Sequence, residues 1–101
     1  MGCRVEFTRA AEADEEMIVA YLAEELGSLQ AAGSFLDALE MAVERISNMP
    51  ESFPPVLESR LAGRGYRKAR VLDYLAIYRR EGDAVVIVRI FHTRQDYAAL
   101  L

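Results

Sequence analysis

The chain has 101 residues, of which 52% are hydrophobic, and a formal net charge of −4 at pH 7. This length fits one domain, expected to span residues 1–101, and the composition is globular and not that of a disordered chain. No apolar stretch approaches the roughly 20 residues that cross a bilayer. We therefore expect no membrane partner.

The N-terminal sequence and the cysteine content favour a cytoplasmic protein. The first residues turn acidic without an apolar signal region, and Cys3 is the only cysteine, which excludes an internal disulfide and fits a reducing compartment. Cys3 and His92 could supply at most two ligands of a metal site. We expect neither a metal ion nor another cofactor.

The charges are divided between the two parts of the chain. Residues 1–58 contain twelve acidic and three basic side chains, whereas residues 59–101 contain nine basic and four acidic ones. Such asymmetry indicates either a surface for a polyanion or attraction between acidic helices and a basic sheet. The overall acidity counts against independent binding to nucleic acid.

The first part of the chain predicts a strand and two helices. Residues 3–7 alternate, with Val5 and Phe7 on one face. Thr8 can cap a helix that Gly27 ends, with apolar positions Ala13, Met17, Tyr21 and Leu22. Ser28 can cap a second helix through Met49, and its apolar stripe consists of Phe35, Leu36, Leu39, Val43, Ile46 and Met49.

The second part predicts the layer that these helices cover. Residues 66–72, 74–80 and 84–91 are rich in aromatic and β-branched residues, and only residues 81–83 separate the last two segments. The fold class is therefore α+β, with a strand and a helical hairpin packed on an antiparallel meander.

Alternation along the last strand predicts which face the helices cover. Because an unpaired arginine is costly to bury, the face of Val85, Ile87, Arg89 and Phe91 should be open or hold a carboxylate partner. The helices should then cover Val86, Val88 and Ile90. His92 follows on the covered side, away from Arg89.

The residues after this strand have both structural and catalytic interpretations. His92 can close the sheet edge, with Asp96 as its partner, or act as a general acid or base. Asp96 can equally pair with Arg94 or Arg89. We expect Tyr97 to pack, with stacking on a base as the alternative.

A basic stretch precedes and enters the meander: it contains Arg60, Arg64, Arg67, Lys68 and Arg70 and no acid. Guanidinium groups bind phosphate or carboxylate in a bidentate manner, so the stretch suits an anionic partner. That partner can be nucleic acid, an acidic protein segment, or the acidic helices of the same chain.

The order of elements and the segment GYRKARVLDYLAIYRREGDAVVIVRIFHTRQDY resemble the RelE/ParE superfamily of type II toxins over essentially the whole chain. The most specific part is the meander, with Tyr74, Tyr78 and Arg79 before a Gly-Asp turn and then VRIFH-x-R-x-D. The resemblance implies one of two activities. RelE-like toxins cleave mRNA on the ribosome without a metal, whereas ParE-like toxins inhibit DNA gyrase without bond chemistry.

Two features favour the ParE-like branch. The nucleases usually place an arginine in the middle strand, where this chain has Leu75, and the ending His92-x-Arg94-x-Asp96 is similar to the ParE-type ending. Loss of one transition-state cation can cost about 10²- to 10³-fold, by analogy with oxyanion donors.

The resemblance also implies a cognate antitoxin, in a toxin–antitoxin hetero-oligomer. The residues expected to contact the antitoxin or the target are Arg60, Arg64, Arg67, Lys68, Arg70, Arg79, Arg89 and Arg94. If the protein is a ribonuclease, the catalytic candidates are Arg89, His92, Arg94 and Tyr97, with His92 or Tyr97 transferring the proton. A third hypothesis is an inactive relative that only binds an antitoxin.

Overall fold

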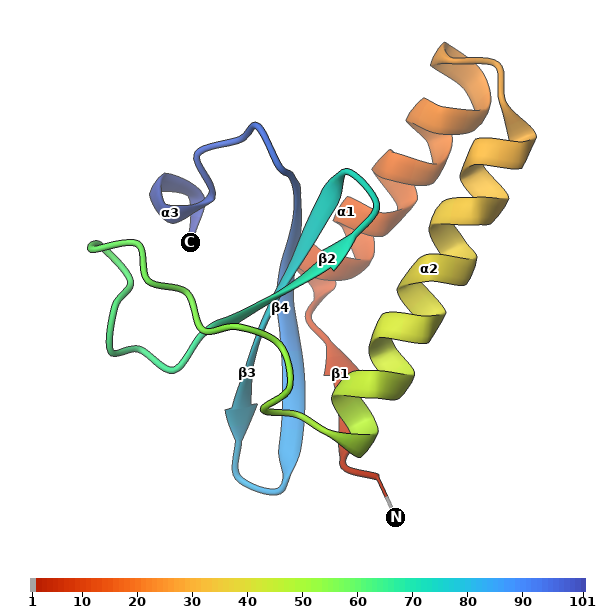
Figure 1. Ribbon diagram of the computed structural model, residues 1–101. Coiled ribbons are helices and arrows are strands. Elements are labelled where there is room, and N and C mark those ends of the chain that lie inside the picture. The colour runs from red at the N-terminus through yellow and green to blue at the C-terminus, as the bar shows by residue number, and fades with distance from the viewer. Residues whose placement is uncertain (1) are drawn as a thin grey trace.

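A computed structural model describes residues 2–101 and confirms the α+β class, with a helical hairpin on one face of a sheet (Figure 1). The chain forms β1 (Arg4–Phe7), α1 (Arg9–Ala20), a π-helical turn η1 (Tyr21–Glu25), α2 (Leu29–Asn48), β2 (Arg67–Val71), β3 (Tyr74–Glu81), β4 (Ala84–His92) and α3 (Tyr97–Leu100). Among these residues, no helix combines the length and apolarity needed to cross a membrane.

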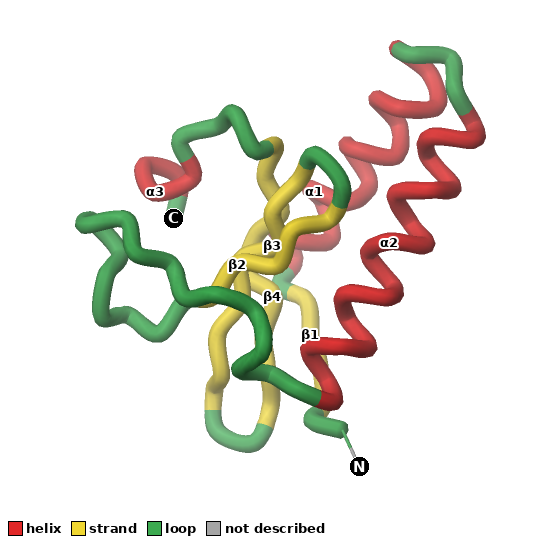
Figure 2. Tube along the Cα trace, in the orientation of Figure 1, coloured by secondary structure: helices red, strands yellow, loops and turns green. Residues whose placement is uncertain are grey.

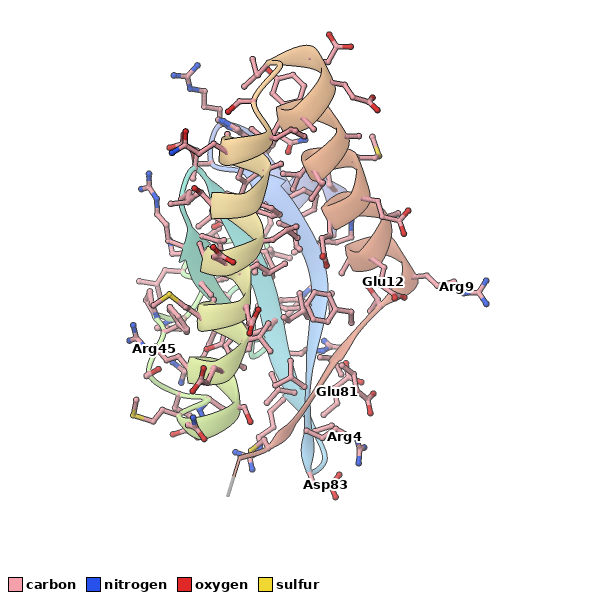
Figure 3. The ribbon with its side chains drawn as sticks, turned by 90° about the vertical axis from the view of Figure 1, so that its right-hand side faces the viewer. Arg4, Arg9, Glu12, Arg45, Glu81 and Asp83 are labelled. Atoms are coloured by element: carbon pink, nitrogen blue, oxygen red, sulfur yellow. The ribbon has the colours of Figure 1, made fainter. Side chains whose placement is uncertain are left out.

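The sheet places the N-terminal strand beside the C-terminal one. Its order is β1-β4-β3-β2, with β1 parallel to β4 and the other neighbours antiparallel. The meander is therefore confirmed, and the helical hairpin is the crossover between β1 and the rest of the sheet (Figure 2). Figure 3 shows the two helices in front of the sheet.

The predicted helix signals are confirmed. The Thr8 side chain accepts a hydrogen bond from the Ala11 amide at 3.0 Å, and Ser28 accepts one from Ala31 at 3.0 Å. Gly27 ends the first helix with φ 62°, a conformation that glycine adopts without steric cost. Met49 lies one residue beyond α2 as its C-cap.

The main core lies between α2 and the sheet, but the hairpin extends past it. Phe35, Leu39 and Ile46 are buried as predicted. Met17 and Tyr21, also predicted as apolar contacts, are 71% and 49% exposed, and Met49 is 56% exposed. Figure 1 shows that the tip of the hairpin projects beyond the end of the sheet, and Met17 and Tyr21 line an open pocket between the hairpin and the sheet residues Tyr74 and His92.

The predicted face assignment of β4 is wrong for its first half. Val85 and Ile87 join the core under the helices, whereas Val88 packs on the opposite face. The cause is a β-bulge: Ile77 pairs with Arg89 but Tyr78 pairs with Ile87, so Val88 has no partner and the alternation shifts there. After the bulge, Ile90 faces the helices as predicted.

The reverse face of the sheet is not bare. A second cluster covers it, in which Val56 and Leu61 of the loop after α2 pack with Ile77, Phe91 and Ala98. The loop and the C-terminal segment are joined by Arg60, which donates to both carboxylate oxygens of Asp96, at 2.6 and 3.1 Å. Asp96 therefore pairs with Arg60 and not with His92, Arg89 or Arg94.

Helix α1 closes the part of the β4 edge that β1 does not reach. The pairing of β1 ends at Ile87. Beyond it, the Thr8 hydroxyl donates to the Val88 carbonyl at 2.7 Å, and Asp14 accepts from the Ile90 amide at 2.9 Å. Asp14 also accepts two bonds from the Arg89 guanidinium, at 2.7 and 3.0 Å. Arg89 thus has the carboxylate partner that its position required.

Replacing Asp14 by alanine should destabilise the protein by about 2–4 kcal/mol, because it leaves the Ile90 amide and a half-buried guanidinium without a partner. Urea unfolding would measure the loss. Glu16→Ala is the matched control on an exposed position of the same helix and should change the free energy of unfolding by less than about 0.5 kcal/mol. Equal effects of the two substitutions would contradict the role of Asp14.

The Arg60–Asp96 pair should depend on pH. Hydrogen bonds from Arg60 lower the pKa of the Asp96 carboxyl below its ordinary value. Because the folded pKa is lowered, the contribution of the pair is present above the ordinary pKa and is lost as the pH falls through the folded one. Arg60→Gln should raise the pKa of Asp96, as followed by NMR titration, whereas Arg64→Gln should not. An unchanged titration in Arg60→Gln would refute the pairing.

Candidate functional site

The chain turns directly after β4, and hydrogen bonds from and to His92 hold this turn. The His92 Nδ1 atom accepts a hydrogen bond from the Arg94 amide at 3.1 Å, and the His92 amide donates to Gln95 Oε1 at 2.8 Å. The ring packs edge-on against Tyr74, with centroids 5.3 Å apart. Because Nδ1 is an acceptor here, the neutral ring holds its proton on Nε2.

A cavity of about 400 Å³ lies between this turn and the projecting hairpin. Its walls are mostly apolar and come from the hairpin residues Met17, Ile18, Tyr21, Leu22 and Leu26 and from Asp73, Tyr74 and His92 of the sheet. Burial raises the pKa of the Tyr74 phenol, which therefore stays protonated at neutral pH. The cavity suits an apolar side chain of a protein partner better than a nucleotide.

Arg89 and His92 also share a smaller pocket of about 220 Å³ at the β4 edge, together with Asp14 and Gln95. His92 pairs with Tyr74 of the main core and Arg89 with Ile77 of the reverse cluster, as strand alternation predicted. The two side chains nevertheless share this pocket, because it lies at the edge, where side chains from both faces can reach it. Asp14 raises the pKa of the Arg89 guanidinium through its hydrogen bonds. The cation in this pocket is already neutralised.

The other two catalytic candidates lie apart from this pocket. Tyr97 stacks on Phe91 with ring centroids 6.4 Å apart, in the cluster on the reverse face. The prediction that Tyr97 packs is therefore confirmed. Arg94 is exposed, and its side chain makes no hydrogen bond or ion pair within residues 2–101.

The members of the basic stretch lie in four environments. Arg60 is bound by Glu58 and Asp96. Arg67 and Arg79 line a pocket of about 200 Å³ with Arg80, and the Arg67 guanidinium donates to the Phe53 carbonyl at 2.8 Å. Lys68 and Arg70 line a separate pocket of about 390 Å³. The remaining member, Arg64, is exposed.

Sequence reasoning missed three features of these sites. Arg80 follows Arg79 directly, and this adjacent pair was a usable signal. No signal in the sequence indicated the role of Asp14, because Glu12, Glu15 and Glu16 surround it on the same helix. The apolar walls contributed by Phe53, Pro54 and Leu75 depend on long-range packing.

The arrangement of Cys3 and His92 rules out a shared metal site. Cys3 directly precedes Arg4, which pairs with Ala84 at the start of β4, whereas His92 ends that strand. Eight residues of strand, at about 3.3 Å each, separate the two ends. Within the described chain, no group of three His, Cys, Asp or Glu side chains could hold a metal ion.

The fold is similar to those of several solved toxin structures. A structure of the chromosomal ParDE toxin–antitoxin system from P. aeruginosa matches with a TM-score of 0.71 and 18% identity, covering 89% of this chain and 95% of that chain. The RelBE2 toxin–antitoxin complex from Mycobacterium tuberculosis matches with a TM-score of 0.64 and 24% identity, covering 91% and 92%.

The E. coli DinJ–YafQ complex matches with a TM-score of 0.59 and 19% identity, covering 100% of this chain and 99% of that chain. No curated protein sequence matches. The family model for the ParE toxin of the type II toxin–antitoxin system parDE matches residues 5–97. This match covers nearly the whole chain, and the protein therefore belongs to the ParE toxin family, within the RelE/ParE superfamily.

Proposed function

We propose that this protein, acting as one domain of residues 1–101 in the cytoplasm, inhibits DNA gyrase and is neutralised by a cognate antitoxin. The observation that supports it best is the state of the groups that a ribonuclease would use. Cleavage of RNA requires a base, an acid and cations around one phosphate. Here Arg89 is neutralised by Asp14, Tyr97 stacks on Phe91, and His92 is held by the Arg94 amide.

The target surface in this proposal is the end of β4 together with the projecting hairpin. Met17, Tyr21 and Leu26 expose large apolar side chains beside the cavity, and such contiguous exposure is typical of protein contacts. Arg94 lies two residues after His92, and its guanidinium has no hydrogen-bond or ion-pair partner among residues 2–101. A mostly apolar surface with an arginine at its margin fits the composition of protein interfaces.

The ribosome-dependent mRNA endonuclease remains the second candidate, because Arg89 and His92 share the pocket at the β4 edge. The fold similarity to the RelBE2 complex is compatible with either activity. The antitoxin partner is supported by the family of the chain and by the three similar structures, which belong to toxin–antitoxin systems.

Mixing the purified protein with gyrase and relaxed plasmid should block supercoiling and trap the cleavage complex. Arg94→Glu should raise the inhibitory concentration about tenfold, equivalent to about 1.4 kcal/mol, because it replaces a cation at the interface by an anion. The control is Arg9→Glu, since Arg9 points away from the sheet at the start of α1 (Figure 3). Unimpaired supercoiling with wild-type protein would refute the proposal.

Toeprinting on translating ribosomes should reveal no new mRNA ends after addition of the protein. New ends that disappear in His92→Ala, with the fold preserved by circular dichroism, would replace gyrase inhibition by the nuclease function. The histidine is the informative position because it is the only one in the sequence, and imidazole is the side chain that most often transfers protons in catalysis.

A further inference from the structure

The pocket lined by Arg67, Arg79 and Arg80 lies at the opposite end of the sheet from the proposed gyrase surface. Arg80 is the last residue but one of β3, whereas Tyr74 begins this strand and lines the cavity at the hairpin. The strand between residues 74 and 80 rises about 3.3 Å per residue, which separates the two places by about 20 Å. The pocket is therefore a site of its own.

Arg67 is fixed by the loop after α2 but is not neutralised there. Its Nη1 atom donates to the Phe53 carbonyl at 2.8 Å and to the Glu51 carbonyl at 3.3 Å. These bonds leave the Nε and Nη2 atoms without a hydrogen-bond partner within residues 2–101. No carboxylate in that part of the chain forms an ion pair with Arg67. The half-buried cation is thus held in place with one edge unused.

Arg89 shows what such an edge can bind. Its Nε and Nη2 atoms donate to the two carboxylate oxygens of Asp14, at 2.7 and 3.0 Å. This edge of a guanidinium matches the spacing between two oxygens of one anion. Because the same edge of Arg67 has no partner among the described residues, it is available to an anion from outside the chain.

Other arginines add positive charge around this end of the sheet. Arg80 is exposed, and its side chain makes no hydrogen bond or ion pair within residues 2–101. Arg45, in the last turn of α2, donates to the loop that also holds Arg67, again without a carboxylate partner. Arg79 differs, because Glu81 binds it at 3.1 Å. Three guanidinium groups therefore stay unneutralised here.

Glu51 is the one acidic residue that lines this pocket in the described chain. It is exposed, and its carboxylate forms no ion pair with the arginines beside it. The pocket therefore remains cationic although an acid stands at its margin. An anion that enters it is attracted by the arginines and repelled by Glu51.

The size of the pocket and its donors select a phosphate group. Its volume is about 200 Å³, which suits one small anionic group, because pockets for drug-sized ligands measure about 300–1,000 Å³. A carboxylate has two oxygens, and a single guanidinium edge engages both. A phosphate monoester has three free oxygens and a charge of about −1.5 to −2 at neutral pH, so it can bind Arg67 and Arg80 together.

We propose that the pocket between Arg67 and Arg80 binds a terminal phosphate group, carried by a free nucleotide or by the 5′ end of a nucleic acid. The Nε and Nη2 atoms of Arg67 donate to two phosphate oxygens, and Arg80 donates to the third. The remainder of the ligand stays outside the pocket. Because this site lies apart from the proposed gyrase surface, the inference does not depend on gyrase inhibition.

The test is an NMR titration of the isotopically labelled full-length protein at constant ionic strength. Adenosine monophosphate and a DNA tetranucleotide with a 5′-phosphate should shift the Nε–H resonance of Arg67, whereas adenosine and the unphosphorylated tetranucleotide should not. At least tenfold tighter binding of the phosphorylated tetranucleotide than of the mononucleotide assigns the site to a nucleic-acid end. A smaller ratio assigns it to free nucleotides.

Three results would overturn the inference. One is the absence of binding by both phosphorylated probes. Another is equal binding of the tetranucleotide with and without its 5′-phosphate, which would reflect general attraction to the DNA backbone. The third is tighter binding of glutarate than of adenosine monophosphate, which would make the pocket a site for a partner's carboxylate.

Substitutions on the wall of the pocket should change the affinity for adenosine monophosphate in opposite directions. Arg80→Gln should lower it about fivefold, because it removes one charged donor. Arg67→Lys should lower it about tenfold, because it keeps the charge but loses the paired donors. Glu51→Gln should raise it about twofold by removing repulsion. Arg9→Gln, the control, removes an exposed arginine at the start of α1 and should have no effect.

The two exposed positions keep the test decisive if Arg67→Lys fails to fold. Equal losses of affinity in Arg80→Gln and Arg9→Gln, or no gain in Glu51→Gln, would refute a defined site. Failure of this inference is distinguishable from failure of the proposed function, because gyrase inhibition is measured separately. A protein that blocks supercoiling but binds no phosphate would keep its proposed function and lose this site.

Discussion

The structure depends on how the second half of β4 satisfies its backbone. This strand is central in the sheet as far as Ile87, where β1 ends, and beyond that point its outer edge would be unpaired. Buried backbone groups without partners are costly. The Thr8 hydroxyl and the Asp14 carboxylate supply the missing partners from the first turns of α1. Helix α1 is thereby fixed along the β4 edge, and the projecting hairpin follows from its direction.

This fixation also limits how far the acidic helices neutralise the basic sheet. Within residues 2–101, Asp14 and Arg89 form the one ion pair between a helical acid and a base of the sheet. The other acids of α1 and α2 make no ion pair with a base of the sheet in the described part of the chain. Internal attraction therefore accounts for little of the charge division, and cations such as Lys68 and Arg94 are free for a partner.

Local signals predicted the elements, whereas tertiary contacts determined the sites. Thr8, Ser28 and Gly27 act through neighbours in sequence, so their roles could be inferred from the sequence. The face assignment of β4 failed because residues 85–88 are all apolar, and such a run gives no sign of a bulge at Val88. The partner of Asp96 could not be inferred, because Arg60 is 36 residues away and several other arginines were equally plausible.

The pocket beside β2 and the end of β4 are joined through the backbone of Thr93. The Thr93 amide donates to the Asp73 carbonyl at 2.9 Å, which joins the turn between β2 and β3 to the end of β4. Thr93 lines the pocket beside β2, and its neighbours His92 and Arg94 belong to the proposed gyrase surface. A partner that binds this pocket therefore lies beside Arg94 without any change of fold.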